Sequence, residues 1–342
     1  MWLVYIGLFC LWPGQSCELV GQTASPSRQS ASRGDLRLMW YNVENLFFPG
    51  DDSIPSDDDF TPDGVRRWTY TRYRAKLTAL ARVIVAAGEW EPPEVVGLCE
   101  VEEATVLEDL VQHPVLAAYN YTFIHKQSKD HRGMDVACLY RENRVRLLEW
   151  SGHTPESSMV QEGTRDILNL CFAWSRSDTL DLFLVHFISK YGGAGATARR
   201  RINQAQWLLS LADSVHTIRG GTLKVLAGDF NDSFQGYSME PLQRGLIGGD
   251  TLRSVSLSGG EGSYKYRGRW SQIDQYLVGG PVGKYRIDGS VLNLWPLITE
   301  DEVYGGVKPA RTYEGYSYAG GISDHLPILL DISRRSLFHS ER

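Results

Sequence analysis

The sequence has few cysteines, and none is spaced for a metal or redox centre. Its 342 residues include five cysteines, with no Cys-x-x-Cys pair and no zinc-ligand spacing. Cys99, Cys138 and Cys171 fall in apolar runs typical of strands, which predicts small buried side chains. A disulfide scaffold and a cysteine-based zinc site are therefore not expected.

An excess of positive charge is also missing. The chain has 35 basic and 41 acidic residues and a net charge of −6. A general nucleic-acid binder usually carries a basic excess, because neutralising phosphates dominates its affinity. The composition therefore does not require a nucleic-acid partner, although a local basic patch could still bind one.

No apolar run at the N-terminus is long enough to span a bilayer. The run from Trp2 to Trp12 suits the core of a signal peptide, with Gly14 and Ser16 placed for a cut before Cys17. The first residues lack Lys and Arg, and a lipid anchor at Cys17 is an alternative with a poor motif before it. We expect a secreted or periplasmic protein, organised as a signal peptide (1–16), a flexible leader (17–35) and a single domain (36–342).

Strand-like and helix-like runs alternate without a linker or repeat, which favours one large domain. Helical spacing of apolar residues occurs over 71–87, 104–111 and 198–215. Strands are predicted over 36–42, 95–100, 134–140, 146–150, 167–173, 180–187, 223–229, 271–278 and 326–332. This mixture predicts an α/β fold with two sheets packed inside helices.

Polar residues end or interrupt five of these apolar strands. They are Asn42, Glu100, His186, Asp229 and Asp274. A single acid in such a place often only caps a loop. Five are harder to explain in that way, because buried carboxylates are costly without a metal or a cationic partner.

The most specific motif is Ala227-Gly228-Asp229-Phe230-Asn231-Asp232. In an extended backbone Asp229 and Asn231 point to the same side, which suits a water or phosphate oxygen beside a metal. A second motif, Ser323-Asp324-His325, is weak alone because Asp next to His is common by chance. Asp274, in Ser271-Gln272-Ile273-Asp274, supplies an acid that could orient a histidine.

Taken in chain order with Trp40–Asn45 and Val96–Glu102, these motifs resemble the endonuclease/exonuclease/phosphatase superfamily. That group includes DNase I, apurinic endonucleases, inositol polyphosphate 5-phosphatases and neutral sphingomyelinases. The similarity covers about 36–332 and is greatest to exported bacterial members. It implies a DNase I-like four-layered α/β sandwich, two mixed β-sheets packed between helices, with the site at one end of the sheets.

The resemblance also implies a Mg²⁺-dependent phosphoester hydrolase, in which Mn²⁺ can substitute. Glu100 matches the principal metal ligand, with Asn42 and Asp324 close to the metal or the phosphate. His325 matches the catalytic histidine, and Asp274 the acid that fixes its tautomer.

Three further residues match catalytic positions of the family. Asp229 would activate or orient the attacking water, Asn231 would hold a phosphate oxygen, and His186 would bind phosphate. By itself, a histidine on an apolar strand is more often a satisfied core residue. The resemblance leaves open whether Asp229 or His325 is the general base, how many metal ions bind, and whether cleavage is endo or exo.

Two segments extend the phosphate site. Arg165 resembles part of an Arg-Glu segment by which DNase-like members touch backbone phosphate, and Arg132 and Asp135 open another strand at a comparable place. An arginine presents a planar donor fork suited to phosphate. A surface ion pair is the alternative for each arginine.

The substrate class is less defined. Segment 263–270 shows no inositol-phosphatase signature; its aromatics, interleaved with Lys and Arg, could stack a base or form an exposed hairpin. The leading hypothesis is a nuclease-type phosphodiesterase acting as a monomer without a stable protein partner. A phosphatase or phosphodiesterase for lipid head groups or small organic phosphates is the alternative. A non-catalytic binding module would need a lost ligand or histidine, and every such position is filled.

Overall fold

The computed structural model describes residues 35–50, 58–89, 91–130, 132–155 and 164–335, which form one compact unit. The predicted signal peptide and, except for residue 35, the predicted leader lie outside the described residues. Within the described ranges, no helix is long and apolar enough to cross a membrane.

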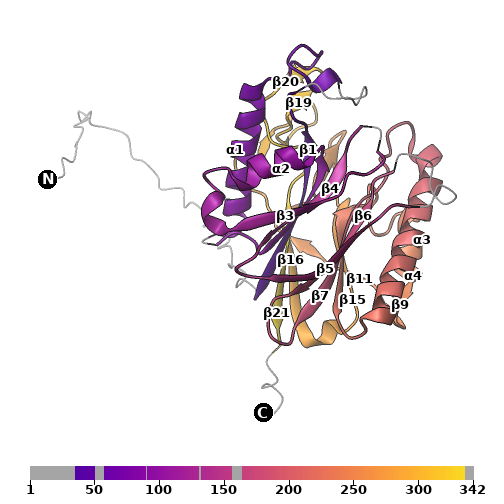
Figure 1. Cartoon of the computed structure of the whole chain (residues 1–342). Helices are drawn as coiled ribbons and strands as arrows, with labels where there is room; N and C mark the ends of the chain where they lie inside the picture. Colours follow the sequence, from indigo (N-terminus) through magenta and orange to yellow (C-terminus); the bar gives the residue numbers. More distant parts are fainter. Residues whose placement is uncertain (1–34, 51–57, 90, 131, 156–163, 336–342) are drawn as a thin grey trace, which may run out of the picture. The chain divides into compact units, whose positions relative to one another are not determined.

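Two large mixed sheets form the centre of the unit (Figure 1). The seven-stranded sheet has the order β12 (Leu257–Ser258), β16 (Tyr285–Val291), β21 (Ile328–Arg334), β1 (Leu36–Leu46), β2 (Val95–Val101), β4 (Asp135–Arg141), β3 (Tyr121–His125). The six-stranded sheet has the order β11 (Arg253–Ser254), β15 (Asp274–Gly279), β8 (Leu223–Asp229), β7 (Thr179–His186), β6 (Ile167–Ala173), β5 (Arg146–His153). β1 pairs with β2 in parallel and β7 with β8 in parallel, whereas most other pairs are antiparallel.

Helices cover the outer faces of both sheets. α1 (Tyr70–Ala86) and α2 (Ala104–Val111) lie beside the seven-stranded sheet, and α3 (Ala194–Ile218) and α4 (Glu240–Arg244) beside the six-stranded sheet (Figure 1). The layers are therefore helix, sheet, sheet and helix. The four-layered α/β sandwich predicted from the resemblance is confirmed.

The alternation of side chains along β7 shows why most strand residues are apolar on both faces of the sheet. Leu182 and Leu184 belong to the core shared with the seven-stranded sheet, whereas Phe183 and Val185 pack with Leu208 of α3. Both faces of the sheet are covered, so both sets of alternate residues must be apolar. Cys99, Cys138 and Cys171 are buried and free, as predicted.

Most predicted elements are present, but three differences matter. The run predicted over 271–278 is divided between β14 (Arg269–Ser271) and β15, because the chain turns from a hairpin into the large sheet. β16 was not predicted, since Arg286, Asp288 and Gly289 break its apolar alternation. The exposed hairpin that was one reading of segment 263–270 is present as β13 (Tyr264–Tyr266) with β14. Three other small hairpins were not predicted: β9 (Leu246–Ile247) with β10 (Asp250–Thr251), β17 (Ile298–Glu300) with β18 (Val307–Pro309), and β19 (Tyr313–Glu314) with β20 (Ser317–Tyr318).

Candidate active site

Strand register brings the polar strand ends of the six-stranded sheet together. Asp229 is the direct partner of His186 on β7 and of Asp274 on β15. In the other sheet, Asn42 pairs with Cys99, the residue before Glu100. Asn42, Glu100, His186 and Asp229 line a cavity of about 650 Å³ together with Asp324 and His325, and Asp274 lies behind His325.

Glu100 lies at an irregularity of β2. The register of β2 shifts between Cys99 and Val101 against both β1 and β4, and Glu100 has φ +64°. A residue with a side chain rarely takes this left-handed conformation, and bulges of this kind often redirect a side chain at a functional site. Here the bulge turns the Glu100 carboxylate into the cavity, which an unbroken pleat would not do.

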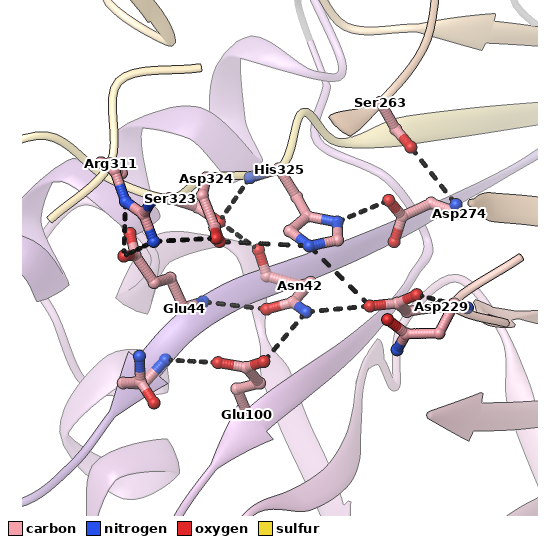
Figure 2. A network of polar contacts seen from close by, with 12 residues as sticks. Asn42, Glu44, Glu100, Asp229, Ser263, Asp274, Arg311, Ser323, Asp324 and His325 are labelled. Atoms are coloured by element: carbon pink, nitrogen blue, oxygen red, sulfur yellow. Dashed lines mark hydrogen bonds and ion pairs between the residues drawn. The ribbon is translucent and has the colours of Figure 1, made fainter. Parts of the chain in front are cut away.

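Asn42 connects the two sheets through its side-chain amide. Its Nδ2 donates to Glu100 Oε1 and to Asp229 Oδ2, each at 3.2 Å, while its Oδ1 accepts from the Glu44 N–H at 3.0 Å (Figure 2). The Asn45 N–H donates to the other oxygen of Glu100 at 3.0 Å. Asn42 therefore orients two carboxylates that come from different sheets.

His325 is held by a carboxylate and faces the cavity with its other nitrogen. Its Nδ1 lies 2.7 Å from Asp274 Oδ2 (Figure 2). The other oxygen, Asp274 Oδ1, accepts from the Trp40 indole N–H at 2.9 Å. The Nε2 atom of His325 lies 3.8 Å from Asp229 Oδ2 and 4.0 Å from Asp324 Oδ1. Asp274 thus fixes the tautomer and the direction of the ring.

Burial and charge act in opposite directions at this pair of residues. Burial lowers the pKa of His325, but the contact with Asp274 outweighs it and holds that pKa well above its usual value. Burial, with the charge of Asp274, raises the pKa of Asp229 to about 7, although His325 and Asn42 act in the opposite direction.

His186 lies near the carboxylates of both Glu100 and Asp229. Its Nε2 is 3.7 Å from Asp229 Oδ2 and 4.0 Å from Glu100 Oε1. Its Nδ1 is buried and has no hydrogen-bond partner among the described residues. Burial, together with the nearby charges of Arg165 and Arg132, holds the pKa of His186 well below its usual value. A neutral imidazole at the cavity wall suits contact with a substrate oxygen.

Asn231 follows β8 in a left-handed conformation, with φ +52°. Its N–H donates to Asp229 Oδ1 at 2.8 Å and its Nδ2 donates to the Phe187 carbonyl at 3.0 Å. The residue lines the cavity. It fixes the second oxygen of Asp229, leaving Oδ2 directed to Asn42 and His325.

Two groups of residues could hold a divalent cation. One ligand atom from each of Asp229, Asp274 and His325 can be chosen so that all three lie within 4.8 Å of one another. However, both oxygens of Asp274 already accept hydrogen bonds, and a cation there would displace the His325 proton. Glu100 and Asp324 present oxygens at the cavity, with side chains 18% and 22% exposed, and hard oxygens around a partly hydrated ion suit Mg²⁺. The Glu100 side of the cavity therefore fits the cation better.

The three residues predicted to bind substrate take different places. Arg165 and Arg132 line the cavity, and Arg165 Nε is 3.0 Å from Asp130 Oδ2 in a buried ion pair. The Arg132 side chain is 48% exposed. Asp135, in contrast, is fully buried and accepts from the Ser128 N–H at 3.0 Å, while His125 Nε2 lies 3.0 Å from its other oxygen. Asp135 fixes the loop before β4 and does not line the cavity.

Several residues of the site were not singled out from the sequence. Trp40 binds Asp274, Lys190 and Tyr191 line the cavity, and Arg311 Nη2 lies 3.1 Å from Asp324 Oδ2. An indole in an apolar strand gives no sign that its N–H is used. The Ser-Asp-His motif could have prompted a search for a cation beside Asp324, but nothing marks Arg311 as that cation.

Comparison with known proteins identifies the class. Residues 37–334 match the endonuclease/exonuclease/phosphatase family, and the chain belongs to that family. The chain is therefore a phosphoester hydrolase, of a family that generally uses a divalent metal ion. A search of curated proteins found no match.

Solved structures with the same fold are distant in sequence. An endonuclease/exonuclease/phosphatase from Bacteroides vulgatus is 14% identical, with a TM-score of 0.57 over 88% of this chain and 99% of that one. D. rerio TDP2 complexed with single strand DNA product is 15% identical, with a TM-score of 0.53 over 87% and 98%. Bacteroides thetaiotaomicron mannosyl-6-phosphatase Bt3783 is 15% identical, with a TM-score of 0.52 over 87% and 99%. At these identities the similarity shows the fold alone.

Proposed function

We propose that this protein is a Mg²⁺-dependent phosphodiesterase of nuclease type. The observation that carries the proposal is the directed pair of His325 and Asp274 facing Asp229 across a cavity that also receives Glu100. In this arrangement a proton acceptor, a candidate cation site and phosphate-binding donors meet around one volume. Phosphoester hydrolysis requires all three at the reacting phosphorus.

Glu100 and Asp324 would hold the metal ion, with Asn42 fixing Glu100 from behind. A bound divalent ion neutralises charge on the phosphate oxygens and on the departing oxygen. His186, Asn231, Arg165 and Arg132 line the same cavity and would contact the remaining phosphate oxygens. Neutralising these oxygens removes the repulsion that makes phosphate esters resistant to a nucleophile.

A water molecule attacks phosphorus opposite the departing oxygen in this mechanism. The water proton passes to one of the two candidate bases, Asp229 or His325 Nε2, and the P–O bond to the leaving group breaks. The leaving oxygen takes a proton from the protonated base or from solvent to give an alcohol. Asp274 keeps the proton of His325 on Nδ1, so that Nε2 is the nitrogen presented to the cavity. Asn231 and Asn42 hold the two oxygens of Asp229 in place.

Nucleic acid is the favoured substrate because aromatic and basic side chains line the cavity around the candidate catalytic residues. Tyr264 and Tyr266 line the cavity together with Lys190 and Arg132. Aromatic rings beside basic side chains suit nucleotides, which present a flat base next to a phosphate. Similar folds in TDP2 with a DNA product and in mannosyl-6-phosphatase fit both this substrate class and the alternative, a small organic phosphate.

The test uses the purified domain with Mg²⁺ on plasmid DNA, single-stranded DNA and RNA, and on bis(p-nitrophenyl) phosphate and sugar phosphates. Cleavage of nucleic acid that EDTA abolishes and Mg²⁺ restores is expected. Turnover of a small phosphate monoester without nucleic-acid cleavage would replace the nuclease proposal by the alternative. Activity that survives EDTA and dialysis would remove the metal from the proposal.

We also propose that the chain is exported and acts as a monomer. The apolar run from Trp2 to Trp12, followed by small residues before Cys17, supports export. Fractionation and N-terminal sequencing of the protein from cells would show a new terminus near Cys17. An uncut chain in the cytosol would contradict it.

A further inference from the structure

A small hairpin extends the active-site cavity outward. Its first strand, β13, forms a bridge to His325 through Tyr264, and the ring of Tyr264 lies 4.8 Å from the imidazole of His325. Side chains alternate along a strand, so Tyr266 lies on the same side as Tyr264. Both tyrosines line the cavity. The Tyr264 ring therefore lies beside His325, and the Tyr266 ring lies farther out along the hairpin.

A further exposed tyrosine lies at the tip of the hairpin. Tyr304 lies in the turn between β17 and β18 and packs against the hairpin at Gly268, where an added Cβ would be 2.9 Å from the Cβ of Tyr304. Tyr266 and Tyr304 are each 57% exposed. Tyr304 is not among the residues that line the cavity, whereas an exposed ring at a cavity rim, such as that of Tyr266, often marks a binding surface. We call Tyr264 and Tyr266 the aromatic ledge.

The aromatic ledge is held in place from its other side. Lys265 lies between the two tyrosines of β13; its Nζ is 2.8 Å from Asp301 Oδ2 and donates to the carbonyls of Gly305 and Val307. The Lys265 and Asp301 side chains are each 5% exposed. The hairpin is thus fixed to the β17–β18 turn before any ligand arrives, which limits the entropy lost on binding.

The charge of the hairpin differs from that of the whole chain. Residues 263–271 contain three basic side chains and no acidic one, within a chain of net charge −6. Lys265 forms an ion pair with Asp301, whereas Arg267 and Arg269 are exposed. The Arg267 guanidinium is 5.3 Å from the centre of the Tyr266 ring. Exposed arginines interleaved with aromatic rings complement a ligand with flat bases joined by phosphates.

We propose that the aromatic ledge binds the bases of single-stranded nucleic acid on one side of the cleaved phosphate, with Arg267 and Arg269 paired to the backbone. The two residues from Tyr264 to Tyr266 span about 6.7 Å of strand, which suits successive unstacked nucleotides. A duplex would keep its bases stacked away from these rings. The inference rests on the proposed nuclease function and specifies its substrate.

The test measures how much a base next to the cut contributes. An oligodeoxynucleotide with a single hydrolysable linkage is compared with the same strand carrying abasic residues on one side of that linkage. The base effect is the ratio of the two kcat/KM values, and we expect roughly tenfold for the wild-type protein, the usual worth of one stacked base. In Tyr266→Ala the ratio should fall close to one.

Two control variants separate stacking from general damage. Tyr266→Phe keeps the ring and should keep the base effect. Tyr237 is 71% exposed in the short helical turn Tyr237–Met239 beside α3, so Tyr237→Ala removes an exposed tyrosine elsewhere. Tyr237→Ala should keep the wild-type ratio, because only rings of the aromatic ledge contribute to it.

Each other outcome overturns a stated part of the proposal. A wild-type ratio near one, or an unchanged ratio in Tyr266→Ala, overturns the ledge while leaving the nuclease function intact. Turnover of bis(p-nitrophenyl) phosphate without cleavage of any oligonucleotide overturns the nuclease function; anisotropy of a labelled, uncleavable strand then decides the ledge separately. Sedimentation with phosphatidylcholine–phosphatidylglycerol vesicles that Tyr266→Ala abolishes would assign the ledge to a membrane surface instead.

Discussion

His325 Nδ1 lies 2.7 Å from Asp274 Oδ2, although 51 positions separate the two residues in the chain. The carboxylate is carried by a strand of the six-stranded sheet and the histidine by the loop before a strand of the seven-stranded sheet. Their contact fixes which nitrogen of His325 reaches the cavity, and the predictions below begin with it.

Asp274→Asn should lower kcat by about 10²- to 10⁴-fold with a small change in KM. The amide keeps the shape of the side chain but no longer holds the Nδ1–H tautomer or balances the charge of a protonated ring. Steady-state kinetics on the best substrate measure the effect, and circular dichroism checks the fold. A rate within threefold of wild type would show that His325 does not need this partner.

Glu100→Gln should weaken metal binding by at least tenfold and lower the rate by about 10². Calorimetric titration with Mg²⁺, or with Mn²⁺ as a stronger-binding probe, gives the affinity without relying on turnover. Asp274→Asn is the matched variant, because Asp274 belongs to the other possible cation group, with Asp229 and His325. If Asp274→Asn loses the metal and Glu100→Gln keeps it, the cation belongs to that group.

Arg132→Gln should raise KM several-fold for a nucleic-acid substrate and reduce the dependence of KM on salt, because one phosphate partner is lost. Half of the Arg132 side chain is exposed, so the fold should tolerate the change. Asp135→Asn is expected to act differently. Its carboxylate serves a buried loop, so the variant should lower stability rather than salt dependence. Equal salt dependence in all three proteins would exclude a phosphate contact by Arg132.

Gly97→Ala should destabilise the protein by about 1–3 kcal/mol, the usual effect of overpacking a core. A Cβ at Gly97 would lie 2.8 Å from Leu184 and 2.8 Å from the Trp40 ring. Gly195, in α3, has open space around it, so Gly195→Ala is the control and should be neutral or slightly stabilising. Urea denaturation measures both variants. An unchanged free energy of unfolding in Gly97→Ala would show that the contact between the sheets at Gly97 can widen without cost.

Residue patterns predicted most of the fold because both sheets are covered on both faces. Strands such as β6 and β8 are mostly apolar, with one polar residue inside each run (Asn169 and Lys224), and could be delimited from the sequence alone. β16 escaped prediction because Arg286, Asp288 and Gly289 lie where packing on neighbouring strands, rather than apolar alternation, defines the strand. The small hairpins are too short for periodicity to show.

The candidate site could be predicted in its residues but not in its geometry. The resemblance supplied Glu100, Asp229 and His325, since motifs preserve residue types in order. It did not show the left-handed turn at Glu100, or the indole of Trp40 on Asp274, because both depend on contacts between distant strands. Asp135 is the opposite case, because this residue of a predicted motif stabilises the loop before β4 and does not line the cavity.

Asn42 donates one hydrogen bond within its own sheet, to Glu100, and a second to Asp229 in the facing sheet, both at 3.2 Å. Through this amide, the geometry of the reaction centre depends on how the two sheets are aligned. Sliding one sheet past the other by a fraction of an ångström would misplace Asp229 relative to Glu100, while the apolar core between the sheets still excluded water. Mild denaturant should therefore abolish activity before circular dichroism changes, and substitutions deep between the sheets should alter turnover at a distance from any reacting atom.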